Sequence, residues 1–174
     1  SSFASNSKMT DLLALSSAVI DGQTSTAEAG PLNRINFELS EITDQIAMVE
    51  AFSHCILIQT NDGLIAFDTS GVHGGEKVLS SIRGWSNDPF HSLIYTHGHL
   101  DHVGGSGAFM KDAERRGHTK PQVVGHEKLP KRFDRYELTD GYNTIINQRQ
   151  FGQFTRRGYK IQDGNSFIPE GTAR

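Results

Sequence analysis

The chain has 174 residues, with 17 Lys and Arg, 20 Asp and Glu, and a formal net charge of -3. This balance produces no large positive field, which argues against a nucleic-acid-binding protein that relies on phosphate neutralisation. A single cysteine, Cys55, excludes an intramolecular disulfide and the cysteine-rich zinc sites. The length suits one domain, and we expect an N-terminal arm with a helix and linker over residues 1–34 and a layered domain over 35–174.

The first predicted element is an amphipathic helix over residues 10–20, followed by a linker rich in small polar residues over 21–31. The apolar run at residues 12–20 has the length of a signal-peptide core, but Asp11 adjoins it and only Lys8 supplies positive charge. No stretch approaches the roughly 18 apolar residues of a membrane-spanning helix. We therefore expect no membrane partner and a cytoplasmic location, with a secreted or periplasmic location as the alternative.

Five apolar runs then predict β-strands: residues 46–49, 55–59, 64–67, 91–96 and 122–126. Asp62 and Gly63 separate the second run from the third, and such a pair is typical of a tight hairpin because the turn needs positive φ. Cys55 lies in an apolar context, which favours a buried, inert thiol. Hairpins mixed with helices predict a layered α/β domain.

Four helical patterns accompany these strands: residues 74–83, a stretch that begins after Gly105, residues 127–136 and residues 142–150. In the second of them, we expect Phe109 to point inward. The charged side chains between Lys111 and Arg116, Asp112 among them, are interpreted as a solvated face.

The most informative segment is Thr-His-Gly-His-Leu-Asp-His at residues 96–102, which offers four metal ligands: His97, His99, Asp101 and His102. Zinc and iron prefer such ligands where no thiolate is available. Chance produces these residue types at this spacing roughly once in a thousand such chains. At the end of a strand, His97 and His99 would project to the same side and converge on one ion. Asp101 and His102 would then reach a second ion beside the first, as in two-metal hydrolytic sites.

This run, continued by Val103-Gly104-Gly105, resembles the signature of the metallo-β-lactamase-fold hydrolases. The resemblance implies an αββα sandwich in which His97 and His99 bind the first metal and Asp101 and His102 the second. Zinc is the implied metal, with iron or manganese as alternatives. Asp101 would also orient the attacking hydroxide, which makes it the expected catalytic residue.

Residues 64–71 resemble the family's strand that ends in an aspartate behind the metal loop. By this resemblance, Asp68 would orient a ligand histidine through the ring nitrogen that does not bind metal. The alternative is a carboxylate that only caps the turn at Gly71.

The downstream ligands of a complete site have no match in this chain, whose last histidine is His126. The resemblance covers about residues 35–155, the N-terminal half of the fold. Three explanations stay open: the chain is a fragment or truncated hydrolase, a partner chain supplies the missing half, or His126, His118 or a carboxylate stands in. A structural role is the simpler interpretation of His126. Since half a sandwich exposes an apolar sheet face, we expect a homo-oligomer or a covering partner chain.

Together these features predict a metal-dependent hydrolase that uses a metal-activated water on an ester-type bond of a small molecule, namely a sulfate ester, carboxylic ester, lactone or lactam. Residues 141–151 are reminiscent of alkyl-sulfatase-like members. The alternative function is a truncated, non-catalytic remnant that binds metal weakly and serves association. Redox chemistry at iron is a third hypothesis, which no cofactor motif supports.

Overall fold

A computed structural model describes residues 10–29, 34–139, 141–143 and 145–146. One sheet carries six strands: β1 (Leu39–Thr43), β2 (Ile46–Val49), β3 (Cys55–Thr60), β4 (Gly63–Phe67), β5 (Phe90–Ile94) and β6 (Gln122–Val124). The helices are α1 (Leu12–Ile20), α2 (Gly75–Trp85), α3 (Leu100–Val103), α4 (Ser106–Arg116) and α5 (Leu129–Leu138). The predicted mixed α/β class is confirmed. The prediction for residues 142–150 lies largely outside the described residues.

The N-terminal helix α1 begins where Asp11 accepts a hydrogen bond from the backbone N–H of Ala14, 2.9 Å away. A carboxylate at this position satisfies an N–H group that has no partner within the helix. None of the helices within the described ranges combines the length and the apolar composition of a membrane-spanning segment.

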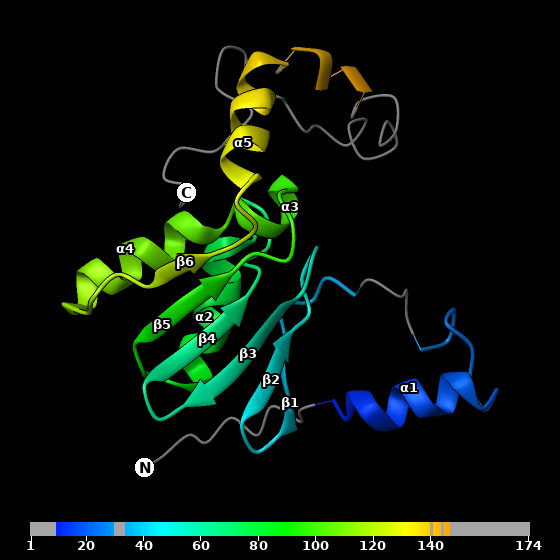
Figure 1. The fold of residues 1–174 in the computed structure, drawn as a ribbon. Coiled ribbons are helices and arrows are strands. Elements are labelled where there is room, and N and C mark those ends of the chain that lie inside the picture. The colour runs from blue at the N-terminus through cyan, green and yellow to red at the C-terminus, as the bar shows by residue number, and fades with distance from the viewer. Residues whose placement is uncertain (1–9, 30–33, 140, 144, 147–174) are drawn as a thin grey trace.

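The sheet order follows the chain, and its pairing changes from antiparallel to parallel at β4. Parallel neighbours need a crossover connection, and here α2 joins β4 to β5 while α3 and α4 join β5 to β6. Figure 1 shows these connections. The C-terminal ends of β4 and β5 therefore lie at one edge of the sheet, where the backbone N–H of Asp68 donates to the carbonyl of Ile94 at 2.9 Å. The segments that follow both strands meet at this edge.

The predicted hairpin between β3 and β4 is confirmed. Gly63 has a φ of 118°, and a Cβ at this position would overlap the carbonyl oxygen of Pro89. Only glycine satisfies both conditions. Strand β1 was missed because its sequence, LSEIT, has no apolar alternation; it is an edge strand held by backbone pairing to β2.

The main core lies between the sheet and helices α2 and α4, which pack on the same face (Figure 1). Cys55 and Leu57 of β3 point into this core, as do Val78 of α2 and Phe109 of α4. Cys55 is fully buried, as predicted, and burial raises the pKa of its thiol. A second, smaller cluster of Tyr95, Val103 and Phe133 attaches α3 and α5.

The opposite sheet face is also apolar. Because side chains alternate along a strand, residues next to the buried ones point away from α2 and α4. The register aligns two rows of partly exposed apolar side chains on this face: Met48, Ile56, Phe67 and Ile94 in one row, and Ile46, Ile58 and Ile65 in the other. We call these seven residues the open face. The expectation that a partner covers this face stays a prediction.

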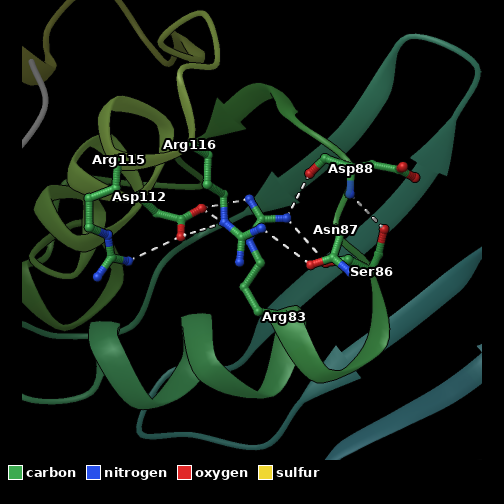
Figure 2. Close-up of polar contacts among 7 residues, drawn as sticks. All are labelled: Arg83, Ser86, Asn87, Asp88, Asp112, Arg115 and Arg116. Atoms are coloured by element: carbon green, nitrogen blue, oxygen red, sulfur yellow. Dashed lines mark hydrogen bonds and ion pairs between the residues drawn. The ribbon is translucent and has the colours of Figure 1, made fainter.

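The prediction that Asp112 faces water was wrong, because Asp112 is only 1% exposed. Figure 2 shows its carboxylate between three arginines. Oδ2 accepts from Nε and Nη2 of Arg83 at 3.0 and 2.7 Å, and Oδ1 accepts from Arg115 and Arg116 at 3.1 and 3.0 Å. Burial alone would raise the pKa of Asp112, but hydrogen bonds from Arg83 and Arg116 lower it. A buried carboxylate is tolerated when it is paired in this way.

Arg83 also connects α2 to the segment that leads into β5. Its Nη1 donates to the carbonyls of Ser86 and Asp88 at 3.1 and 2.7 Å (Figure 2). The Asp112 carboxylate thus fixes α4, α2 and the start of β5 relative to one another. Sequence periodicity could not reveal this, because Arg83 lies on another helix.

Candidate metal centre

The loop that follows β5 carries the first two predicted ligands. β5 ends at Ile94, so His97 and His99 lie in this loop and not on the strand. They nevertheless come together, with His97 Nε2 3.0 Å from His99 Nδ1. Gly98 between them is buried, and a Cβ there would meet the Leu129 side chain of α5 at 2.7 Å. The small residue lets α5 pack against the loop while both histidines stay exposed.

Helix α3 carries the other two predicted ligands. His102 Nε2 lies 3.5 Å from Asp101 Oδ2, and the rings of His97 and His102 have centroids 4.0 Å apart. The structure therefore links the four predicted ligands by pairwise contacts, from His99 through His97 and His102 to Asp101. Among the described residues, however, the group whose ligand atoms all lie within 4.8 Å of one another contains His97 and His102 but neither His99 nor Asp101. By contrast, His126 is exposed, and its Nδ1 accepts a hydrogen bond from the backbone N–H of Lys128 at 3.2 Å.

Asp68 lies behind this cluster at the end of β4. Its Oδ1 accepts from the backbone N–H of Thr96 at 2.8 Å, and its Oδ2 accepts from the Thr96 hydroxyl and from His102 Nδ1, each at 2.6 Å. With Nδ1 engaged, His102 presents Nε2 to an ion, the arrangement found where a carboxylate orients a metal-binding histidine.

A second geometric interpretation makes Asp68 itself a ligand. Ligand atoms of Asp68, His97 and His102 all lie within 4.8 Å of one another, which would suit a three-residue site within the described part of the chain. We favour the orienting role, because three donors already occupy the two oxygens of Asp68 and a residue exposure of 5% leaves little access.

The donor set fits zinc or iron, since it offers three imidazoles and a carboxylate without a thiolate. Burial, reinforced by the neighbouring His102 and His99, lowers the pKa of His97. A lowered pKa favours the neutral imidazole, which is the form that binds metal.

Sequence reasoning missed two residues of this site, Thr96 and Ser53. Thr96 is the first residue of the motif, and although the sequence assigned it no role, it donates twice to Asp68. Ser53 lies in the loop between β2 and β3, and its hydroxyl donates to Asp101 Oδ2 at 2.7 Å. A lone serine in a loop gives no signal in the sequence, so only the fold could reveal Ser53.

The comparisons with known proteins identify the family. The chain belongs to the metallo-beta-lactamase superfamily, whose family model matches residues 49–159, more than half of the chain. This finding confirms the resemblance drawn from the histidine motif. It also agrees with the mixed α/β architecture of the described residues.

Two curated relatives share part of the sequence. The linear primary-alkylsulfatase of Pseudomonas sp. (strain ATCC 19151) is 37% identical over 59 residues, covering 33% of this chain and 11% of the relative. The 2,4-dinitroanisole O-demethylase subunit alpha of Nocardioides sp. (strain JS1661) is 29% identical over 106 residues, covering 57% of this chain and 30% of the relative. The chain thus spans a third or less of the length of either.

Among solved structures, BJP-1, a subclass B3 metallo-beta-lactamase of Bradyrhizobium japonicum, matches with a TM-score of 0.45 and 25% identity. The match covers 56% of this chain and 36% of that protein. The sec-alkylsulfatase Pisa1 from Pseudomonas sp. matches with a TM-score of 0.41 and 20% identity, over 51% of this chain and 14% of that protein.

Proposed function

We propose that this chain provides metal-binding residues of a metal-dependent hydrolase that acts on an ester-type bond. The observation that carries the proposal is the series of close contacts that joins four potential metal ligands, from His99 through His97 and His102 to Asp101, with Asp68 hydrogen-bonded to His102 from behind. Membership of the metallo-beta-lactamase superfamily supports the same chemistry.

Each residue of the cluster has a distinct task in this proposal. His97 and His99 would hold the first metal, and Asp101 and His102 the second. When bound, zinc lowers the pKa of water toward about 7 and polarises the group under attack. Asp101 would also orient the attacking water, and its side chain is 37% exposed, which leaves it accessible to a substrate. Asp68 would keep His102 in the tautomer that presents Nε2.

The names of the relatives do not agree on one substrate. One curated relative is named an alkylsulfatase and another an O-demethylase, and BJP-1 is a β-lactamase. These names span different substrates, so a panel of chromogenic sulfate, carboxylic and lactam substrates suits a first screen. We expect turnover to require added zinc.

The test compares the full chain with the Asp101→Ala variant on the best substrate of that screen. Loss of a group that binds metal and orients water should lower turnover by roughly 100-fold or more. Asp62→Ala, at an exposed turn, serves as the matched control. Circular dichroism should show an intact fold for both variants, and equal turnover in Asp101→Ala and the parent chain would refute the role.

The second candidate is a non-catalytic metal-binding or association protein. It is favoured by the position of His126, which does not join the ligand group among the described residues. Elemental analysis separates the two functions: close to two metals per chain supports the hydrolase, whereas none or one loosely held ion supports the second candidate.

A further inference from the structure

The loop between β2 and β3 brings a hydroxyl group to the metal centre from a distant part of the sequence. Ser53 Oγ donates to Asp101 Oδ2 at 2.7 Å, across a separation of 48 residues. Ser53 has a φ of 64°, in the left-handed region that residues other than glycine and asparagine seldom adopt. An unfavourable backbone conformation of this kind persists where the surrounding structure imposes it, and such conformations are concentrated at functional sites.

The surrounding contacts show what imposes this conformation. The Ser70 hydroxyl donates to the carbonyl of Phe52 at 2.6 Å, and His54 Nδ1 accepts from the backbone N–H of Ala51 at 3.2 Å. Ser70 follows Asp68 by two residues and also has positive φ, 61°. The segment after β4 thus makes two contacts at this site: Asp68 orients His102, and Ser70 anchors the loop that carries Ser53.

We propose that Ser53 is a positioning residue that holds the Asp101 carboxylate beside His102 for the second metal. The inference rests on the proposed function of the four-ligand cluster. Asp101 Oδ2 accepts the Ser53 hydrogen bond and also lies 3.5 Å from His102 Nε2, the nitrogen that Asp68 leaves free. Without the Ser53 hydroxyl, the partly exposed Asp101 carboxylate would sample more rotamers, and it would lose this conformational entropy when it binds an ion. Ser53 thus does for Asp101 what Asp68 does for His102.

The left-handed backbone permits a test that separates positioning from stability. Ser53→Ala removes the hydroxyl and keeps the backbone penalty, whereas Ser53→Gly removes both. We expect both variants to bind the second metal equivalent roughly 10- to 100-fold more weakly, the usual effect of losing a group that orients a ligand. The thermal midpoint of metal-free Ser53→Gly should equal or exceed that of the parent chain, because glycine accepts positive φ. Ser53→Asn tolerates this backbone and retains a donor, so it should restore part of the affinity.

The measurement is a titration of the full chain with Zn²⁺ against a chromogenic chelator, together with the visible spectrum of the Co²⁺-loaded chain. Ser40→Ala is the control, since Ser40 Oγ is a buried hydroxyl without a hydrogen-bond partner among the described residues. If the parent chain fails to bind a second ion, the proposed function is wrong and Ser53 has nothing to position. If the parent chain binds two ions and Ser53→Gly binds both as tightly, only the Ser53 role is overturned. Should Ser53→Ala fail to fold, Ser53→Gly and Ser53→Asn decide.

Discussion

Asp68 Oδ2 lies 2.6 Å from His102 Nδ1, which joins the residue after β4 directly to helix α3. The same carboxylate accepts two hydrogen bonds from Thr96 at the start of the motif. One buried side chain therefore fixes both the approach to the histidine loop and the ring orientation of a predicted ligand.

Replacement of Asp68 by Asn should weaken metal binding by roughly 10- to 100-fold. An amide offers one acceptor oxygen where the carboxylate offers two, so a donor of Thr96 or His102 loses its partner. Zinc competition against a chelator measures the effect, with the exposed Asp62→Asn as control. Unchanged affinity in Asp68→Asn would leave Asp68 with a purely structural role.

Asp112→Ala should destabilise the fold by roughly 3–5 kcal/mol, because it leaves the guanidinium of Arg83 without its ionic partner between α2 and α4. Urea unfolding measures this loss. Glu114→Ala, an exposed position on the same helix, should change stability by less than about 0.5 kcal/mol. A similarly small effect in Asp112→Ala would show that the interface does not depend on this charge.

The lowered pKa of Asp112 also predicts how the stability of the fold changes at acidic pH. The folded-state pKa of Asp112 is lowered, so its contribution is complete above the unfolded-state pKa of about 3.9 and is lost as pH falls through the lower folded-state pKa. The stability difference between the parent chain and Asp112→Asn should therefore be constant near neutral pH and shrink below about pH 4. A difference that instead grew on acidification would contradict the assignment.

Two glycine substitutions should have opposite effects on stability. At Gly105 a Cβ would overlap the carbonyl oxygen of Thr69 and lie 2.8 Å from Gly75 Cα, so Gly105→Ala should cost about 1–3 kcal/mol. Gly84 is exposed in α2 with open space at the Cβ position, and Gly84→Ala should stabilise by about 0.4–1 kcal/mol. Thermal unfolding of both variants tests the pair. Equal midpoints would contradict the close approach of α4 to Thr69.

The open face predicts self-association or another covering partner. Sedimentation velocity of the full chain should show an oligomer, and Ile58→Lys in the centre of that face should shift it toward the monomer. Glu76→Lys, on an exposed position of α2, is the control. A compact monomer of the parent chain, without bound partner, would contradict the expectation.

The sequence predicted the features that short-range patterns determine. The β3–β4 hairpin follows from one Asp-Gly pair, and the proximity of the four predicted metal ligands follows from their density between His97 and His102. What could not be predicted depends on contacts between distant segments. In the sequence, Asp112 looks like a surface charge, and only the fold places Arg83 of another helix beside it. Ser53 likewise looks like an ordinary loop serine, and only the fold places its hydroxyl next to Asp101. β1 escaped notice because its sequence has no apolar alternation, and its backbone pairing to β2 becomes visible only in the fold.

The position of the predicted ligands beyond the ends of β4 and β5 has an evolutionary consequence. The side chains of His97, His99 and Ser53 take no part in the hydrogen-bond ladders of the sheet, which are formed by backbone groups of the strands. The strands form a frame whose stability is largely independent of the groups displayed at its edge. Such a frame can acquire new reactivity through a few loop substitutions without having to fold anew.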